Sequence, residues 1–421
     1  MIANISIQNF GSIKDKQTLS FEATKSEELE NYYIAEPVKG VRILKMLLIY
    51  GANASGKTTI LKAIEFLRNL VLDPADKKNE ELDFTPFLFD SNTPKENSHI
   101  AIEFFQKEVR YYYEIAFNSK AIVTEKLFFY NPNKARIYSR KTDLENQFTE
   151  ISFGTKIRND KTFEKTLEAN TLWNNTVLGG FLKTNIESKE LNDVIDWFSD
   201  YLSSMIFSKT QLDKIVTNSI ENMQIDKSIL LSILKKADFN ISDIQINDDT
   251  KFITKFGGAI NEYINVPIKK IEFEHTVDNN KYFLPIKEES EGTQRYYGLA
   301  GLLTMLIQHA VAIPIDELEA SLHPDLFIHF ILSFLINAKK SQVFATTHNR
   351  EILNNKDIFR NDAIWFTNKN DQSATELYSL SDFDSKVIRD TSNVYNAYKI
   401  GKLGGVPNLG DYYIDIDNEK D

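Results

Sequence analysis

The chain has 421 residues, a net charge of −11 and no cysteine, and it contains 29 Phe and 18 Tyr. The lack of cysteine excludes disulfides, thiolate metal sites and cysteine catalysis, and it favours a reducing compartment. The acidic balance argues against a surface that binds nucleic acid all over, although it leaves room for a local basic groove. No signal peptide opens the sequence and no apolar run is long enough to span a membrane, so we expect a cytoplasmic protein without membrane contact.

The first predicted elements are strands and a phosphate-binding loop. Ile5 and Ile7 indicate an opening strand, and residues 22–40 are expected to form a loop. Residues 46–50 predict a buried parallel strand that leads into the pattern G-x-x-x-x-G-K-T, followed by apolar residues at helical spacing to about Leu70. The candidate nucleotide-binding residues are Gly51, Ala52, Asn53, Ala54, Ser55, Gly56, Lys57, Thr58 and Thr59.

This loop predicts a bound nucleoside triphosphate together with Mg²⁺. Backbone N–H groups of such a loop surround phosphate oxygens, Lys57 would reach the β- and γ-phosphates, and the Thr58 hydroxyl would be a metal ligand. The helix that follows directs its positive end at the same phosphates. The competing interpretation is an ordinary glycine-containing turn with a solvated lysine, and the apolar strand and helix on either side favour the phosphate loop.

The middle of the chain changes from strands to helices. Alternating apolar residues in 100–104, 111–117 and 122–130 predict an antiparallel meander. Residues 161–238 are helical in pattern and rich in charge, and strands return at 241–246 and 270–274. The paired lysines are candidates for a nucleic acid contact, although such pairs are more often solvated surface. They are Lys235 and Lys236, Lys269 and Lys270, and Lys339 and Lys340.

A helix opening with Ser290 and Gly292 follows. Ser290 suits the N-cap position, Gly292 permits a close backbone approach, and apolar residues between 299 and 307 continue at helical spacing. The N-terminus of a helix attracts anions. Taken alone, these residues favour the interpretation of a plain helix cap.

Two carboxylates end the next apolar run. Residues 311–315 predict a strand, and Asp316 and Glu317 follow it directly. In phosphate-loop enzymes, an aspartate at the tip of a neighbouring strand completes the Mg²⁺ shell, and a glutamate after it can polarise the attacking water. We therefore expect Asp316 as a metal ligand and Glu317 as a catalytic residue, with an exposed acidic turn as the alternative. Pro314 is unusual in a central strand and predicts a local bend.

A helix, a strand and a histidine complete the pattern. Pro324 suits the first turn of a helix, and apolar residues recur at helical spacing up to Ala338. Residues 342–346 predict a short strand, and His348 stands just beyond its end. A lone histidine usually has no special role, but at this position its side chain can touch the γ-phosphate, so His348 is a second catalytic candidate.

The order of these four segments resembles the ABC-type ATPase heads of the SMC and RecF group. In that family the Ser-x-Gly helix is the signature motif, which completes the ATP site of a second subunit in a head-to-tail dimer. The resemblance implies that Ser290 and Gly292 contact the γ-phosphate of ATP bound by the other copy. Residues 321–323 would form the D-loop, and His348 would be the switch histidine.

The match is closer still to stand-alone bacterial ATPases of the RloA and AbiL type, which are linked to phage defence. Residues 290–295, 316–324, 346–349 and 398–407 carry this resemblance. The signature departs from the usual form, since Glu291 replaces the first glycine and Thr293 stands where glutamine is usual. Candidates for the glutamine of the Q-loop are Gln106 and Gln211, so the rate of ATP hydrolysis stays open.

We therefore expect an α/β fold, a P-loop NTPase head of ABC-ATPase type with an antiparallel β subdomain and an inserted helical segment. One discontinuous head would comprise a first lobe at 1–155 and a second lobe at 265–421, with a helical insertion at 156–264. The leading hypothesis is an ATP-hydrolysing switch that closes a homodimer and controls a separate nuclease or toxin effector in phage defence. The alternatives are a RecF-like DNA repair ATPase and an ATP-binding scaffold that scarcely hydrolyses.

Overall fold

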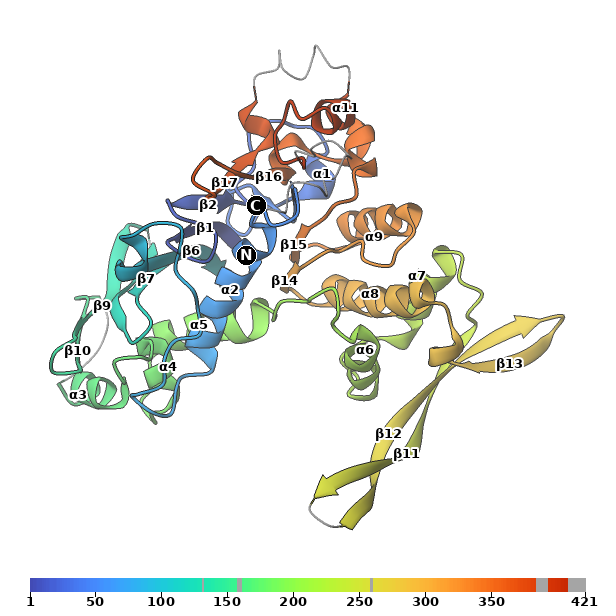
Figure 1. The fold of residues 1–421 in the computed structure, drawn as a ribbon, viewed down its shortest axis with the longest axis horizontal. Coiled ribbons are helices and arrows are strands. Elements are labelled where there is room, and N and C mark those ends of the chain that lie inside the picture. Colours follow the sequence, from blue (N-terminus) through green and yellow to red (C-terminus); the bar gives the residue numbers. More distant parts are fainter. Residues whose placement is uncertain (131, 157–160, 258–259, 384–392, 408–421) are drawn as a thin grey trace, which may run out of the picture.

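The computed structural model describes residues 1–130, 132–156, 161–257, 260–383 and 393–407. Figure 1 shows an antiparallel sheet and its helices on one side of α2, further helices on the other side, and a long hairpin that projects away from the body. The fold is mixed α/β, with a mostly parallel sheet of five strands, an antiparallel sheet of seven strands and two smaller antiparallel sheets, and its α/β class is as expected from the sequence.

The five-stranded sheet places the candidate site. Its order is β14-β15-β5-β16-β17, and every neighbouring pair is parallel except β16 and β17. The central strand β5 is buried along its whole length, which its apolar sequence allows. Parallel strands end at the same edge, so the tips of β5, β14 and β15 meet. The strands are β5 Met46–Gly51, β14 Ala312–Ile315, β15 Gln342–Thr346, β16 Ile364–Lys369 and β17 Thr375–Ser379.

The position of β14 explains how the sheet accommodates Pro314. This strand lies at the edge of the sheet and pairs with β15 on one side only. On its other side, the Pro314 carbonyl accepts the Ile206 N–H at 2.9 Å, and the Asp316 N–H donates to the Ile206 carbonyl at 2.8 Å. Because the N–H and C=O of one strand residue point the same way, the missing proline N–H falls outside the β14–β15 ladder.

The seven-stranded antiparallel sheet has the order β10-β9-β8-β7-β6-β1-β2. The three meander strands expected from the alternation are confirmed as β6, β7 and β8, and two further strands extend the meander. The strands are β1 Ile2–Gln8, β2 Gln17–Ser20, β6 Ser98–Gln106, β7 Val109–Phe117, β8 Ile122–Tyr130, β9 Lys134–Asp143 and β10 Phe148–Phe153.

Helices cover the two sheets. α2 follows the phosphate loop, and α8 packs against α6, α7 and α9. None of the helices in the described part of the chain is long and apolar enough to cross a membrane. The helices are α2 Lys57–Leu72, α3 Lys161–Asn170, α4 Val177–Leu182, α5 Lys189–Asp196, α6 Leu212–Glu221, α7 Lys227–Lys236, α8 Glu291–Gln308, α9 Pro324–Asn337 and α11 Val394–Lys399.

The helical insertion expected at 156–264 is shorter than predicted, because a long hairpin begins within this range. Helices occupy the range only as far as α7, and strand β11 Asp243–Gly257 begins well before residue 264. It pairs with β12 Ile260–Val277, which in turn pairs with β13 Asn280–Pro285. The alternation at 241–246 marks only the start of this hairpin, because the polar run at 247–251 interrupts it.

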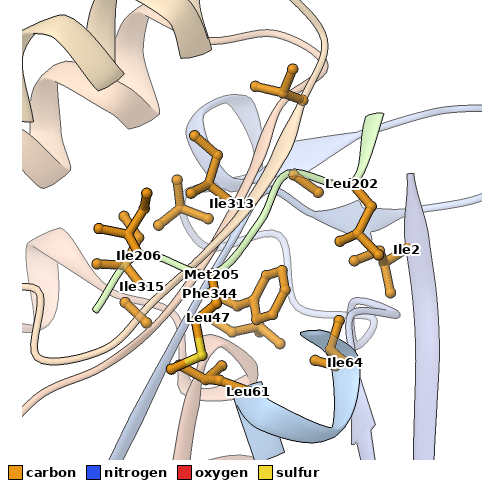
Figure 2. Packing of buried hydrophobic residues seen from close by; sticks show 14 of the residues in the cluster. Ile2, Leu47, Leu61, Ile64, Leu202, Met205, Ile206, Ile313, Ile315 and Phe344 are labelled. Carbon is orange, nitrogen blue, oxygen red and sulfur yellow. The ribbon is translucent and has the colours of Figure 1, made fainter. Parts of the chain in front are cut away.

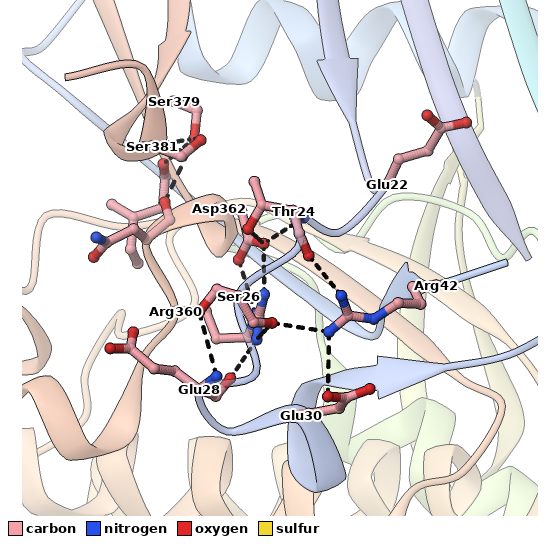
Figure 3. A network of polar contacts seen from close by, with 12 residues as sticks. Glu22, Thr24, Ser26, Glu28, Glu30, Arg42, Arg360, Asp362, Ser379 and Ser381 are labelled. Carbon is pink, nitrogen blue, oxygen red and sulfur yellow. Dashed lines mark hydrogen bonds and ion pairs between the residues drawn. The ribbon is translucent and has the colours of Figure 1, made fainter. Parts of the chain in front are cut away.

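Residues 22–40 are more ordered than the expected loop. They contain α1 Glu30–Tyr33 and β3 Ile34–Ala35, and β3 pairs with β4 Ile43–Leu44. Figure 3 shows the network that fixes this segment. The buried Arg360 guanidinium donates to both Asp362 oxygens at 2.9 and 2.8 Å and to the Ser26 carbonyl at 3.0 Å, while Asp362 accepts the Thr24 hydroxyl at 2.7 Å.

The core beneath the candidate site joins segments that are distant in sequence. Figure 2 shows Leu47 of β5 and Phe344 of β15 packed with Leu61 of α2 and with the segment at 202–206. These side chains are all essentially inaccessible to water, and burying each apolar side chain contributes about 1.5–3 kcal/mol. The packing holds α2 against the strand tips from which the site is built.

Candidate functional site

The phosphate loop runs from the end of β5 to the start of α2. Gly56 is the N-cap of α2 with φ 106°, a conformation that strongly favours glycine. A Cβ at Gly56 would lie 2.2 Å from Thr375 Oγ1, and a Cβ at Gly51 would lie 2.3 Å from Thr367 Oγ1. The loop therefore needs glycine at both positions because β16 and β17 press against it.

Lys57 lies inside the loop. Its ammonium donates to the carbonyls of Gly51 at 2.9 Å and Ala52 at 3.0 Å, and its side chain is buried. Burial lowers the pKa of Lys57, and the nearby carboxylates of Asp316 and Glu317 oppose that shift. A cation held only by carbonyl oxygens in such surroundings gains a stronger partner when phosphate enters the loop.

The Thr58 hydroxyl and the Asp316 carboxylate meet across the sheet. Thr58 Oγ1 donates to the two Asp316 oxygens at 3.0 and 3.2 Å. Both groups are hard oxygen donors of the kind that bind Mg²⁺, which usually takes one or two protein ligands and completes its shell with water and phosphate. No cluster of three or more His, Asp or Glu side chains forms a protein-only metal centre in the described ranges. This donor pair fits Mg²⁺ accompanied by a nucleotide.

Thr346 at the tip of β15 fixes both acidic residues. Its hydroxyl donates to Asp316 Oδ1 at 2.7 Å and accepts the Glu317 N–H at 2.8 Å. Glu317 has φ 51°, a left-handed conformation that is uncommon outside glycine, asparagine and aspartate. One threonine thus binds the Asp316 carboxylate, which also faces Thr58, and the backbone of Glu317, whose side chain is half-buried.

His348 is held by a third carboxylate. Its backbone N–H donates to Glu319 Oε1 at 2.5 Å, which ties the loop after β15 to the loop after β14. Burial and the neighbouring Lys57 lower the pKa of His348, whereas Glu319 and Glu317 oppose that shift. The imidazole is therefore biased toward its neutral form and can accept or donate one proton.

Ser290 and Gly292 stand apart from this cluster. Ser290 is the N-cap of α8 and its hydroxyl accepts the Thr293 N–H at 3.1 Å, as expected from the sequence. A Cβ at Gly292 would have the Ser321 carbonyl at 3.5 Å and Ser290 Oγ as neighbours within 4 Å. No atom of the phosphate loop lies within that distance. The structure thus places the start of the Ser-x-Gly helix beside Ser321.

The remaining loop residues differ in their exposure and contacts. Asn53 and Ala54 are exposed at the apex of the loop, where Ala54 has φ 61°. The buried Ser55 hydroxyl shares a hydrogen bond of 2.6 Å with Thr367, and the Thr59 hydroxyl lies 3.1 Å from that of Ser12. The side chains of Ser55 and Thr59 therefore fix the loop against its neighbours.

Sequence reasoning missed several hydroxyls of the site. Thr346 contacts Asp316, and Thr367 contacts the Ser55 hydroxyl. Thr375 contacts the Ser55 carbonyl, and Ser12 contacts Thr59. A threonine at the carboxyl end of a predicted parallel strand is the available signal for Thr346, but the other three lie on strands and turns that carry no motif. The Q-loop candidates lie at the end of β6 for Gln106 and at the start of α6 for Gln211, and their role stays a prediction.

Comparison with known proteins places the chain among ATPase-like domains. A family model described as "AAA domain, putative AbiEii toxin, Type IV TA system" matches residues 46–354. A comparison with curated proteins finds no match.

Similar solved structures are SMC heads. The SMC head domain from Thermotoga maritima is 12% identical, with 90% of this chain and 98% of that chain covered at a TM-score of 0.42. The SmcHead bound to the C-winged helix domain of ScpA is also 12% identical, with 90% and 97% covered at 0.42. An Smc head domain with an extended coiled coil, bound to the C-terminal domain of ScpA derived from Pyrococcus furiosus, is 11% identical, with 92% and 98% covered at 0.41.

Proposed function

This chain belongs to the AAA domain family whose model spans residues 46–354, and we propose that it is an ATP-hydrolysing switch. The observation that carries the proposal is the cluster of Lys57, Thr58, Asp316, Thr346 and Glu317 at one edge of the parallel sheet. Lysine, hydroxyl and paired carboxylates at the tips of adjacent parallel strands are the groups that phosphoryl transfer to water requires.

Each residue has a distinct task in this proposal. The loop from Gly51 to Thr59 binds the phosphates, and Lys57 exchanges its two carbonyl partners for phosphate oxygens. Thr58 and Asp316 would hold Mg²⁺, which when bound neutralises phosphate charge. Glu317 orients the attacking water and takes its proton, while His348 contacts the γ-phosphate from the tip of β15.

We further propose that two copies enclose the nucleotide. The surroundings of Gly292 hold Ser321 and not the loop of the same chain, so Ser290 and Gly292 are available to the phosphates bound by a second copy. In this arrangement the head consists of a first lobe at 1–155 and a second lobe at 265–421. The inserted part at 156–264 contributes helices and the first strand of the long hairpin.

The Glu317→Gln variant tests the switch. It removes the base but keeps the side-chain shape, so hydrolysis should fall by about 10²–10⁴-fold while ATP still binds. Phosphate release, nucleotide titration and light scattering with ATP and Mg²⁺ measure hydrolysis, binding and dimer formation. Glu351→Gln removes one exposed carboxylate three residues beyond His348 and serves as the control.

Two outcomes would contradict the proposal. Hydrolysis that is unchanged in Glu317→Gln would show that Glu317 is not the base. An ATP-loaded variant that stays monomeric would rule out the sandwiched dimer. A wild-type protein that binds ATP without hydrolysing it would instead indicate a scaffold.

The cellular role we propose is control of a separate nuclease or toxin in phage defence. Support comes from the family description, which names a toxin and a toxin–antitoxin system. The test is expression of the protein with its neighbouring gene in a bacterium challenged with phage. Protection that is lost with Lys57→Met supports the role, and protection that is independent of Lys57 argues against it.

A further inference from the structure

The segment at 393–407 has no task in the proposed reaction, yet it packs against the first residue of the phosphate loop. Asn393 caps α11, and after this helix the chain turns back through Gly401, Gly404 and Gly405, all with left-handed φ of 64–79°. Gly405 is buried, whereas Ile400 is exposed. One face of the turn therefore packs against the protein, and the other face is exposed to solvent.

Tyr398 is the centre of this contact. Its hydroxyl donates to the Gly405 carbonyl at 2.9 Å. The side chain is 3% exposed, and its ring packs edge-on against Tyr50 at 5.8 Å and tilted against Phe366 at 5.2 Å. One buried phenol therefore joins the turn to the end of β5, where the loop begins.

The backbones of the turn and the loop also touch directly. A Cβ at Gly405 would lie 3.2 Å from the Thr367 carbonyl and 3.5 Å from both Gly51 Cα and the Tyr398 ring. With φ 64° and this spacing, glycine lets the turn reach the loop without a side chain between them. A side chain at position 405 would crowd the Thr367 carbonyl and come into van der Waals contact with Gly51.

Tyr398 also reaches the other end of the site. The Arg350 guanidinium lies over its ring, 5.3 Å from the centroid, and Arg350 follows His348 by two residues. A cation over an aromatic face is attracted by the ring, which restrains the loop after β15. The same side chain thus contacts Tyr50, the residue before Gly51, and the loop that carries His348.

We propose that Tyr398 and the glycine turn behind it are positioning elements of the nucleotide site that hold Gly51 in the shape required for phosphate binding. The inference rests on the proposed function. Lys57 holds the Gly51 carbonyl in the structure, and in the proposed reaction it moves to the phosphates. Tyr398 and Gly405 then keep the Gly51 peptide in place after the lysine has left it.

The test is the Kd for ATP with Mg²⁺, measured by calorimetric titration, which also reports the fraction of competent protein as the stoichiometry. Tyr398→Phe removes only the hydroxyl and should raise the Kd by roughly fivefold at unchanged stoichiometry, the effect of one net hydrogen bond. A merely structural role would lower the stoichiometry or the melting temperature without changing the Kd.

Gly405→Ala provides an independent variant with a matched control. The added methyl group crowds the Thr367 carbonyl beside Gly51 and strains the backbone of the turn, so the Kd should rise by about tenfold, more than in Tyr398→Phe. Gly40→Ala imposes the same kind of backbone strain at φ 82° but meets nothing within 4 Å, and its Kd should equal that of the wild type.

The outcomes separate this inference from the proposed function. A wild-type Kd in both Tyr398→Phe and Gly405→Ala, or an equal rise in Gly40→Ala, overturns the positioning role while the ATPase proposal stands. A wild-type protein that shows no ATP binding at all overturns the proposed function itself.

Discussion

The Thr58 hydroxyl and the Asp316 carboxylate, which are 258 positions apart in the chain, lie within hydrogen-bond distance at 3.0 Å. One belongs to the first turn of α2 and the other to the tip of β14, and β15 separates their strands in the sheet. The pair is preformed, so the binding of a cation that needs both groups carries no free-energy cost for bringing the two groups together.

Lys57→Met should weaken ATP binding by about 10–100-fold, since it removes charge-assisted hydrogen bonds to phosphate and keeps the apolar stem. Calorimetric titration measures the loss. Because we expect the dimer to form around bound phosphate, light scattering should also show that ATP no longer induces dimers. Lys62→Met, at an exposed lysine on the same helix, is the control. Normal affinity in Lys57→Met would refute the assignment of the loop.

Thr346→Val should reduce hydrolysis by at least about tenfold while ATP affinity changes little. The valine has the same shape but neither donates to the Asp316 carboxylate nor accepts the Glu317 N–H, so that carboxylate and the backbone that carries Glu317 both lose a partner. Steady-state phosphate release measures the effect. The matched control is Thr347→Val, because that hydroxyl instead accepts the Asn349 N–H at 3.0 Å. If hydrolysis falls equally in the two variants, Thr346 contributes only to the stability of the fold.

Two variants that are each inactive should regain hydrolysis when they are mixed, if each ATP site is shared between two copies. Ser290→Asp keeps an N-cap residue on α8 but places a negative charge where we expect phosphate from the second copy. Mixed with Lys57→Met, it leaves one intact site in each mixed dimer, so hydrolysis should recover to about a quarter of the wild-type rate for random pairing. Phosphate release by the mixture and by each variant alone measures the recovery. Activity that stays at the level of the separate variants would place Ser290 outside the shared site.

The unfolding free energy should rise with pH between about 8 and 10.5 because of Lys45. Burial lowers the pKa of Lys45 to about 8, although its amine donates to the Leu335 and Ala338 carbonyls at 2.8 and 2.7 Å. In this window the unfolded chain binds more protons than the folded one at this position, so raising the pH favours folding. Below the window the penalty of the buried charge is complete, and above it the penalty is absent.

Denaturant unfolding of the wild type and of Lys45→Met across this pH range checks the Lys45 prediction. The other titrating groups are common to both proteins, so the difference in unfolding free energy isolates Lys45. That difference should shift in favour of the wild type as the pH rises. A difference that is independent of pH would show that Lys45 keeps its ordinary pKa in the folded protein.

The sequence by itself determined the local elements of the site. The apolar run before Gly51, the glycine and lysine spacing up to Thr58, and the helical spacing after it predict β5, the loop and α2, and the structure confirms these elements. Asp316 and Glu317 follow a predicted strand for the same reason. Periodicity and turn chemistry act over a few residues, so they can be recognised without the fold.

Only the tertiary structure decided which groups meet. The fold brings Thr58 and Thr346 to Asp316, Gly292 to the Ser321 carbonyl, and Gly405 to Gly51. It also replaced the end of the expected helical insertion with strand β11, in which a polar run at 247–251 interrupts the apolar alternation. Contacts between residues far apart in the chain depend on packing of the whole sheet, and no local pattern carries that information.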